Sequence, residues 1–97
     1  MFALLDEVIP QIQHRAAAYV LMGCDQRYLY KGACRDLYER LEDHRAGRAT
    51  RTKNRRPLRL VHHEYCAMYE EALKRERYLK SGYGRIWLKR LVRKGLG

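Results

Sequence analysis

Glu76 is an acidic residue at a position where a purely structural helix would place an apolar one. The residue pattern over Tyr69–Lys80 predicts a helix, and in it Ala72 and Leu79 point within about 60° of the Glu76 direction. A carboxylate among apolar side chains costs free energy unless it is paired or bound to a metal. Glu76 is therefore a candidate ligand of a divalent cation, and a salt bridge to a buried arginine fits the same pattern equally well.

Arg40 and His44 form a second candidate group, four residues apart at the border of a helix side marked by Leu37 and Leu41. Arginine offers a charged fork to a phosphate, and histidine offers a nitrogen that titrates near neutral pH. The pair could point across a cleft at a phosphate. Ordinary surface placement explains the same spacing.

Three tyrosines lie in strand-like segments. Tyr19 falls on one predicted strand, and Tyr28 and Tyr30 fall on the next, two apart and so on one face. Strand propensity alone explains tyrosines there. A phenol close to a metal or a cation can also accept a proton, and Lys31 would favour such a phenolate if it lay nearby. Alternation along the strand favours the opposite, with Lys31 turned away from Tyr30 as another phosphate contact.

Positive charge gathers in the second half of the chain. Residues 1–44 carry five basic and seven acidic residues, whereas residues 45–97 carry sixteen basic and four acidic ones. The segment 45–59 has seven positive charges and no negative ones. Such asymmetry predicts one basic face that binds nucleic acid, with a solvated surface loop as the alternative. The candidate backbone contacts are Arg48, Arg51, Lys53, Arg55 and Arg56.

The elements that would position these residues show helical periodicity in some segments and strand alternation in others. The predicted order is a helix within the first seventeen residues that begins or bends at Pro10, a hairpin over 18–32, a helix over 36–47, a strand over 58–65, the helix Tyr69–Lys80 and a last helix after Ser81. This order predicts an α+β domain, with a small three-stranded, mostly antiparallel sheet flanked by helices and an extra N-terminal helix.

Length and composition narrow the class of protein. The chain has 97 residues, a formal charge of +10 and 46% hydrophobic residues, which fits one globular domain. No apolar run reaches the roughly 20 residues that a membrane helix needs, and the N-terminus lacks the basic region of a signal peptide. Three cysteines without a CxxC pair favour free thiols. We therefore expect a cytoplasmic protein that does not bind a membrane.

Read in order, these residues resemble the GIY-YIG (URI) nuclease superfamily, and the small stand-alone bacterial members in particular. The similarity covers about Ala18 to Leu91. AYV through YKG matches the two-part signature, with Tyr19 and Tyr30 eleven positions apart. Arg40 and His44 follow at the family's arginine and histidine positions. The stretch EALKRERYLKSGYGRIWLKRL is the most specific, and it places Glu76 at the family's metal-binding glutamate.

The resemblance implies a divalent-metal-dependent endonuclease that hydrolyses phosphodiester bonds in DNA, with Mg²⁺ or Mn²⁺ as the cofactor. Glu76 would hold the metal, and Arg40 would balance charge on the phosphoryl oxygens. Tyr19 or Tyr30 would help to deprotonate the attacking water, and His44 would orient or relay that proton. The sequence leaves open which tyrosine is the base. Binding directed by the backbone or by DNA structure is expected, with branched and nicked DNA among the candidate substrates.

Two departures from the signature keep a second hypothesis open. The first glycine of the signature is Ala18 here. The apolar residue at the centre of the second half of the signature is Lys31. A nucleic-acid-binding module that kept the fold without hydrolysis is therefore the alternative, and a small assembly protein that binds an acidic partner is a third. We expect the nuclease domain over 18–94 and a helical extension over 1–17 for packing or self-association, with a dimer among the candidate assemblies.

Overall fold

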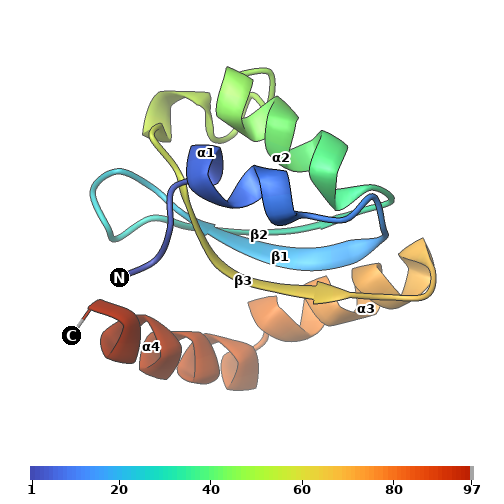
Figure 1. Cartoon of the computed structure of the whole chain (residues 1–97). Coiled ribbons are helices and arrows are strands. Elements are labelled where there is room, and N and C mark those ends of the chain that lie inside the picture. Colours follow the sequence, from blue (N-terminus) through green and yellow to red (C-terminus); the bar gives the residue numbers. More distant parts are fainter. Residues whose placement is uncertain (97) are drawn as a thin grey trace.

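The computed structural model describes residues 1–96 and consists of a three-stranded antiparallel sheet, in the order β2-β1-β3, between two layers of helices. Helices α1 and α2 cover one face of the sheet, and α3 and α4 cover the other (Figure 1). The elements are α1 (Leu5–Val8), the 3₁₀ helix η1 (Ile9–Gln11), β1 (Ala17–Met22), β2 (Leu29–Cys34), α2 (Leu37–Ala46), the 3₁₀ helix η2 (Lys53–Arg55), β3 (Arg59–Tyr65), α3 (Tyr69–Lys80) and α4 (Gly82–Leu96). This arrangement confirms the predicted fold class.

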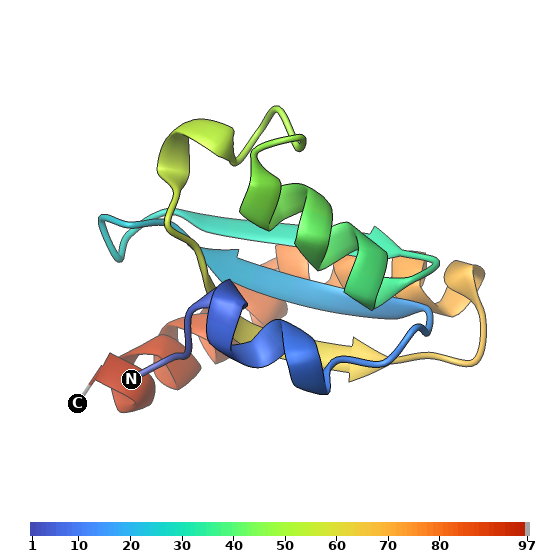
Figure 2. The same cartoon turned by 45° about the horizontal axis from the view of Figure 1, so that its top comes forward.

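The central strand β1 separates two hydrophobic cores. Its six residues AAYVLM are all buried, because helices cover both faces of the sheet. Tyr19 and Leu21 pack with Leu37 and Leu41 of α2, whereas the alternate side chains of β1 pack with α3 and α4. The turned view in Figure 2 shows α1 and α2 side by side over this sheet.

The register between β1 and β2 decides which side chains of β2 share a face. Tyr19 lies opposite Gly32, and Leu21 lies opposite Tyr30, so Tyr30 faces α2. Val20 lies opposite Lys31, and Val20 belongs to the core under α3 and α4. Because β2 is an edge strand, groups on its two faces meet around an open side of the sheet.

Local signals set the ends of the helices that carry the candidate residues. Asp36 accepts a hydrogen bond from the Glu39 amide at the start of α2, and Gly47 ends that helix with φ 83°. Helices α3 and α4 approach closely at Gly84, where an added Cβ would lie 2.1 Å from the Tyr78 carbonyl oxygen. Arg75 donates two hydrogen bonds to Glu64 of β3, at 2.9 and 3.0 Å, which fixes α3 on the sheet.

Two sequence expectations are corrected. The N-terminal helical segment ends at Gln11, not near residue 17, because Pro10 lies in a 3₁₀ turn and Ile12 is already extended. Its apolar side chains still enter the core under α2. The second strand begins at Leu29, which leaves Tyr28 in the turn, because the Asp25 carboxylate accepts hydrogen bonds from the amides of Arg27 and Tyr28. No helix within residues 1–96 has the length and apolar character to cross a bilayer.

Candidate active site

Two tyrosines and a histidine meet on the α2 face of the sheet. The Tyr19 hydroxyl lies 2.8 Å from His44 Nε2, and both residues are fully buried. The Tyr30 ring packs edge-on against His44, with centroids 5.2 Å apart, and lies 6.2 Å from the Tyr19 ring. Tyr30 is half-buried, so it is the one phenol of this pair that reaches the surface. The α2 helix thus brings together residues that are far apart in the sequence.

Thr52 fixes the protonation pattern of this cluster. Its Oγ1 lies 2.7 Å from His44 Nδ1 and itself donates to the Ala49 carbonyl, so His44 Nδ1 carries the proton. His44 Nε2 then accepts the hydrogen bond that the Tyr19 hydroxyl donates. Burial, followed by the charge of Arg40, lowers the pKa of His44 to about 4, which keeps the imidazole neutral at pH 7. Sequence reasoning missed Thr52, because no periodicity marks it in the loop.

The Tyr19 phenol depends on a glycine opposite it. Burial, followed by the neighbouring Tyr30, raises the pKa of Tyr19 well above its ordinary value, so this phenol stays protonated. A Cβ on Gly32 would lie 2.6 Å from the Tyr19 hydroxyl and 2.9 Å from the Tyr30 ring. Only a glycine therefore leaves room for both rings at this point of the edge strand.

Arg40 lies beside both phenols and at the wall of an open hollow. Although partial burial opposes it, the phenol oxygens of Tyr19 and Tyr30 raise the pKa of Arg40. The hollow has a volume of about 290 Å³, and we call it the α2 hollow. Its lining residues are Tyr30, Arg40, Arg48, Ala49, Thr50 and Arg51. Three arginines and one phenol around an open space suit an anionic group such as a phosphate.

Glu76 lies on the other side of the sheet, on α3, which packs against β2 and β1. Its side chain is 20% exposed, and Oε2 accepts a hydrogen bond from Lys80 Nζ at 2.8 Å. The partner is an exposed lysine one turn away, not the buried arginine that the sequence allowed. No ion pair or hydrogen bond within residues 1–96 joins Glu76 to the tyrosines, Arg40 or His44. The α2 face of the sheet thus gathers four of the five candidate catalytic residues, and Glu76 lies on α3, which covers the opposite face.

Two places offer ligands for a metal. His14, Asp36 and Glu39 have ligand atoms within 4.8 Å of one another, but the Asp36 carboxylate already caps α2 and pairs with His14. Within residues 1–96, one carboxylate oxygen of Glu76 forms no hydrogen bond, and the other accepts one from Lys80, whose side chain is exposed. A lone carboxylate of this kind fits a hydrated Mg²⁺ or Mn²⁺ ion, which takes most of its ligands from water and phosphate, and does not fit zinc.

The basic loop is only partly free to bind. Arg48 pairs with Asp43 at 2.8 Å, and Arg55 lies over the Tyr28 ring and 3.8 Å from Asp25. Arg51 and Lys53 are exposed and form no ion pair within the described residues.

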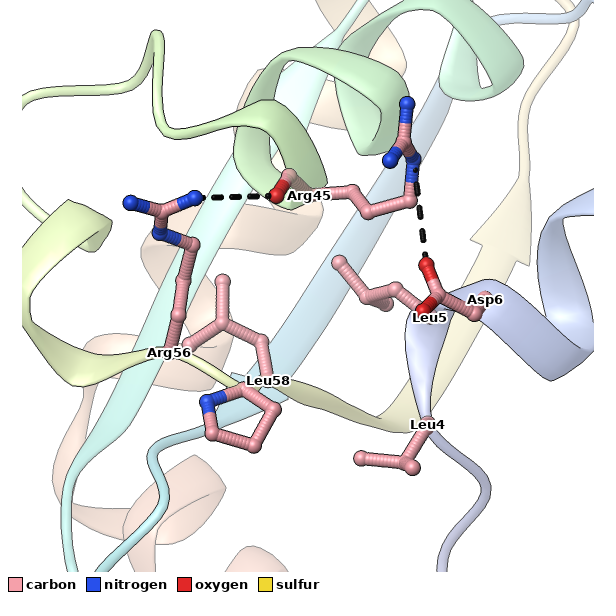
Figure 3. Close-up of a pocket in the computed structure, with 7 residues that line it drawn as sticks. Leu4, Leu5, Asp6, Arg45, Arg56 and Leu58 are labelled. Carbon is pink, nitrogen blue, oxygen red and sulfur yellow. Dashed lines mark hydrogen bonds and ion pairs between the residues drawn. The ribbon is translucent and has the colours of Figure 1, made fainter.

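Arg56 is engaged at the end of α2. Its guanidinium donates to the carbonyls of Lys53 and Arg45, beside a hollow of about 310 Å³ over Leu58 (Figure 3). It also covers Gly47, where an added Cβ would lie 2.7 Å from its guanidinium carbon. Arg56 therefore stabilises the loop as well as adding charge to it.

Lys31 points to the α3 and α4 face, away from the phenols. It lines a hollow with Arg85 and Leu88 of α4. Burial, followed by the charges of Arg85 and Lys80, lowers the pKa of Lys31. Its ammonium group therefore does not assist the ionisation of Tyr19 or Tyr30.

Comparison with known proteins agrees with this geometry. The sequence profile of the GIY-YIG catalytic domain matches residues 16–90. UPF0213 proteins of Staphylococcus aureus strains Mu3, Mu50 and N315 are each 39% identical over 62 residues, which is 63% of this chain and 76% of the relative. No solved structure matches the chain. GIY-YIG domains are nuclease domains, and these nucleases generally depend on a metal. The chain belongs to the GIY-YIG family, and its relatives include the UPF0213 proteins of that family.

Proposed function

We propose that this protein is a divalent-metal-dependent endonuclease that hydrolyses phosphodiester bonds in DNA and is directed by the backbone or the shape of its substrate. The observation that carries the proposal is the α2 hollow. There the half-buried Tyr30 phenol and the Arg40 guanidinium lie at the wall, with the buried Tyr19–His44–Thr52 chain behind them. A family match to a catalytic domain supports the same reading.

The α2 hollow would receive the scissile phosphate. Arg40 is held beside the phenols and offers a charged fork to the phosphoryl oxygens, where negative charge grows in the transition state. Arg48 and Arg51 line the same hollow and would fix the strand on either side, together with Lys53 and Arg55 of the loop. These contacts carry no base information, so we propose that shape and backbone select the substrate.

Tyr30 is the better candidate for the proton acceptor. It is the phenol that faces the hollow, and Arg40 beside it would stabilise its phenolate. Tyr19 is fully buried and donates a hydrogen bond to His44, so it would position Tyr30 and Arg40 rather than meet the water itself. His44, neutral and fixed by Thr52, would hold Tyr19 in place.

Glu76 would hold Mg²⁺ or Mn²⁺ through its carboxylate, with water and the substrate as the remaining ligands. The bound ion would polarise the phosphate and stabilise the leaving oxygen. Because β2 is an edge strand, the substrate would lie across its open side, with the α2 hollow on one face and α3 on the other. Lys80 would have to release the Glu76 oxygen that it holds.

Residues 1–17 would serve the nuclease domain over 18–94 as a packing extension. Leu5, Ile9 and Ile12 lie in the same core as Tyr19, and the Leu4 segment forms a bridge to Arg59 at the start of β3. We propose a cytoplasmic protein without membrane contact that acts on DNA, with branched or nicked DNA as the first substrates to examine. A dimer is the assembly to test first by its mass in solution.

A non-catalytic binding module is the alternative, and its two supporting residues lie away from the cluster. Ala18 has no exposed surface and packs with Val20 and Leu79 in the core under α3 and α4. Lys31 points to that same face. Neither departure from the signature touches the phenols or His44, which favours the catalytic reading.

Cleavage of supercoiled plasmid and of branched DNA with Mg²⁺ or Mn²⁺ tests the proposal. We expect wild type to cleave, and Glu76→Gln to reduce the rate by at least about 10³-fold while binding DNA as before. Glu71→Gln, an exposed acid on the same helix, is the matched control and should cleave like wild type. DNA binding without cleavage by wild type would support the non-catalytic module. Cleavage that survives Glu76→Gln would point to a contaminant.

A further inference from the structure

A second cationic hollow lies between the edge strand and the last helix. It has a volume of about 230 Å³, and we call it the α4 hollow. Its lining residues are Arg27, Leu29, Lys31, Arg85, Leu88 and Lys89. Leu88 is buried in the core, and Leu29 packs against that core, so the floor is apolar. Four cationic side chains therefore surround an apolar floor, on the face of the sheet opposite to the α2 hollow.

The cations of the α4 hollow form no ion pair within residues 1–96, although the charge of Arg27 contributes to the lowered pKa of Asp25. Within residues 1–96, no carboxylate lies within 4.0 Å of the charged groups of Arg27, Lys31, Arg85 or Lys89. The basic loop differs, since Arg48 and Arg55 are paired there with Asp43 and Asp25. Unpaired cations held close together repel one another, and an anion that enters relieves the repulsion. The lowered pKa of Lys31, caused by burial and then by Arg85 and Lys80, agrees with this crowding.

Lys80 connects the hollow to the candidate metal carboxylate. Lys80 is close enough to Lys31 to act on its charge, and the same Lys80 is bonded to Glu76. An anionic chain that passes Glu76 would therefore meet these cations next. A single phosphate ion would reach only part of this row, whereas a polyanion with regular charges along its length could contact all of it.

We propose that the α4 hollow binds the DNA backbone beyond the cleaved bond, so that the substrate is held on both faces of the edge strand. This proposal rests on the proposed nuclease function and adds a second site of phosphate contact to it. The hollow supplies charge and an apolar floor without groups arranged to read bases, so its contribution is to affinity and to the path of the strand. The alternative is that the α4 hollow binds an acidic surface of another protein.

A matched pair of variants on one helix tests the assignment. Arg85→Gln/Lys89→Gln removes two cations that line the hollow, and Arg90→Gln/Lys94→Gln removes two at the same spacing on another side of α4. All four side chains are exposed, so both variants should fold. Fluorescence anisotropy of a labelled 20-base-pair duplex in EDTA, between 50 and 200 mM NaCl, measures binding without cleavage. Labelled polyglutamate is titrated in parallel.

We expect the hollow variant to bind the duplex about tenfold more weakly at 100 mM salt, and the slope of log Kd against log salt to fall by about 2. The control pair should change Kd by about twofold or less. Equal weakening in both pairs would overturn the α4 hollow while leaving the nuclease proposal in place, as wild-type cleavage would still show. A wild type that binds no duplex at 50 mM salt would overturn both proposals. Loss of polyglutamate binding alone would assign the hollow to an acidic protein.

Discussion

On the α2 face of the sheet, three polar side chains of the candidate site are buried and bonded to one another, whereas the candidate groups on the α3 and α4 face reach solvent. Tyr19, His44 and Thr52 form a closed chain in which each polar atom has a partner. Glu76 and Lys31 are only partly buried, and the cations around them are mostly unpaired. Substitutions within the buried chain Tyr19–His44–Thr52 should therefore change folding together with chemistry, and those at the partly exposed residues of either face should change binding or chemistry alone.

The largest effect we expect on the α2 face separates the two tyrosines. Tyr30→Phe removes the phenol that faces the hollow, so the cleavage rate should fall about 10²–10⁴-fold while the free energy of unfolding changes little. Tyr19→Phe should also slow cleavage, and it should cost about 1–3 kcal/mol of stability because it leaves His44 Nε2 buried without a donor. Single-turnover cleavage and urea unfolding of both variants measure the split.

Tyr78→Phe, on the exposed side of α3, is the control and should match wild type in both measurements. If Tyr30→Phe cleaves normally and Tyr19→Phe is inactive yet stable, the assignment of the two tyrosines is reversed. The buried Tyr19 phenol would then be the proton acceptor. The difference in exposure between Tyr19 and Tyr30 would then not decide which of them takes part in the chemistry.

The next effect is a pH dependence of stability that belongs to His44. Its pKa is lowered to about 4 in the folded protein from an ordinary value of 6.5, so the folded state binds the proton less readily than the unfolded state. The resulting stability is present above pH 6.5 and is lost as the pH falls toward 4, by about 3 kcal/mol in full. Urea unfolding at pH 7 and 4.5 should show this loss.

His44→Gln isolates the histidine from the carboxylates, which titrate in both proteins. The variant should lose about 2 kcal/mol less than wild type between pH 7 and 4.5, whatever its stability at pH 7. If it does not fold, an NMR titration of the wild-type imidazole gives the same answer, with an expected pKa below 5. A pKa near 6.5 would contradict the closed chain.

The sequence was informative where local signals decide structure. Asp36 is the N-cap and Gly47 the C-cap of α2, as predicted. Both residues act through neighbours in the sequence, Asp36 through a side-chain hydrogen bond and Gly47 through its left-handed backbone conformation. The bounds of α3 were predicted as Tyr69–Lys80 and observed so. Tyr30 and Lys31 face opposite sides of the sheet, as strand alternation predicted.

What the sequence could not reveal depends on contacts between distant segments. Thr52 lies in an irregular loop, and only the folded loop brings it to His44. The α4 hollow joins Lys31 to Arg85, which are 54 positions apart, so no window of sequence contains it. Glu76 shares α3 with the buried Ala72 and Leu79, and its partner is Lys80, because residues four positions apart on a helix lie next to each other.

A smaller effect distinguishes structure from binding within the basic loop. Arg56→Gln should lower the free energy of unfolding by about 1 kcal/mol, because it removes two hydrogen bonds to carbonyls near the end of α2. Arg51→Gln should leave stability within about 0.5 kcal/mol of wild type and weaken DNA binding instead. Thermal unfolding and duplex binding of both variants measure this. If Arg56→Gln unfolds like wild type and only weakens DNA binding, Arg56 is a binding residue without a structural role.

The smallest stability change we expect comes from Lys80→Met, which removes the exposed partner of Glu76. An ion pair four residues apart on a helix contributes about 0.3–0.5 kcal/mol, so the variant should unfold almost like wild type. The affinity of the variant for Mn²⁺ and its affinity for DNA should change in opposite directions. Freed from the ammonium group, Glu76 should bind Mn²⁺ about fivefold more tightly, whereas duplex DNA in EDTA should bind more weakly because one cation beside the α4 hollow is gone. Lys74→Met, exposed on the same helix, controls for the loss of charge. An equal change in Mn²⁺ affinity in both variants would mean that Lys80 has no specific effect on metal binding by Glu76. The charged groups on the α3 and α4 face would then act independently of one another.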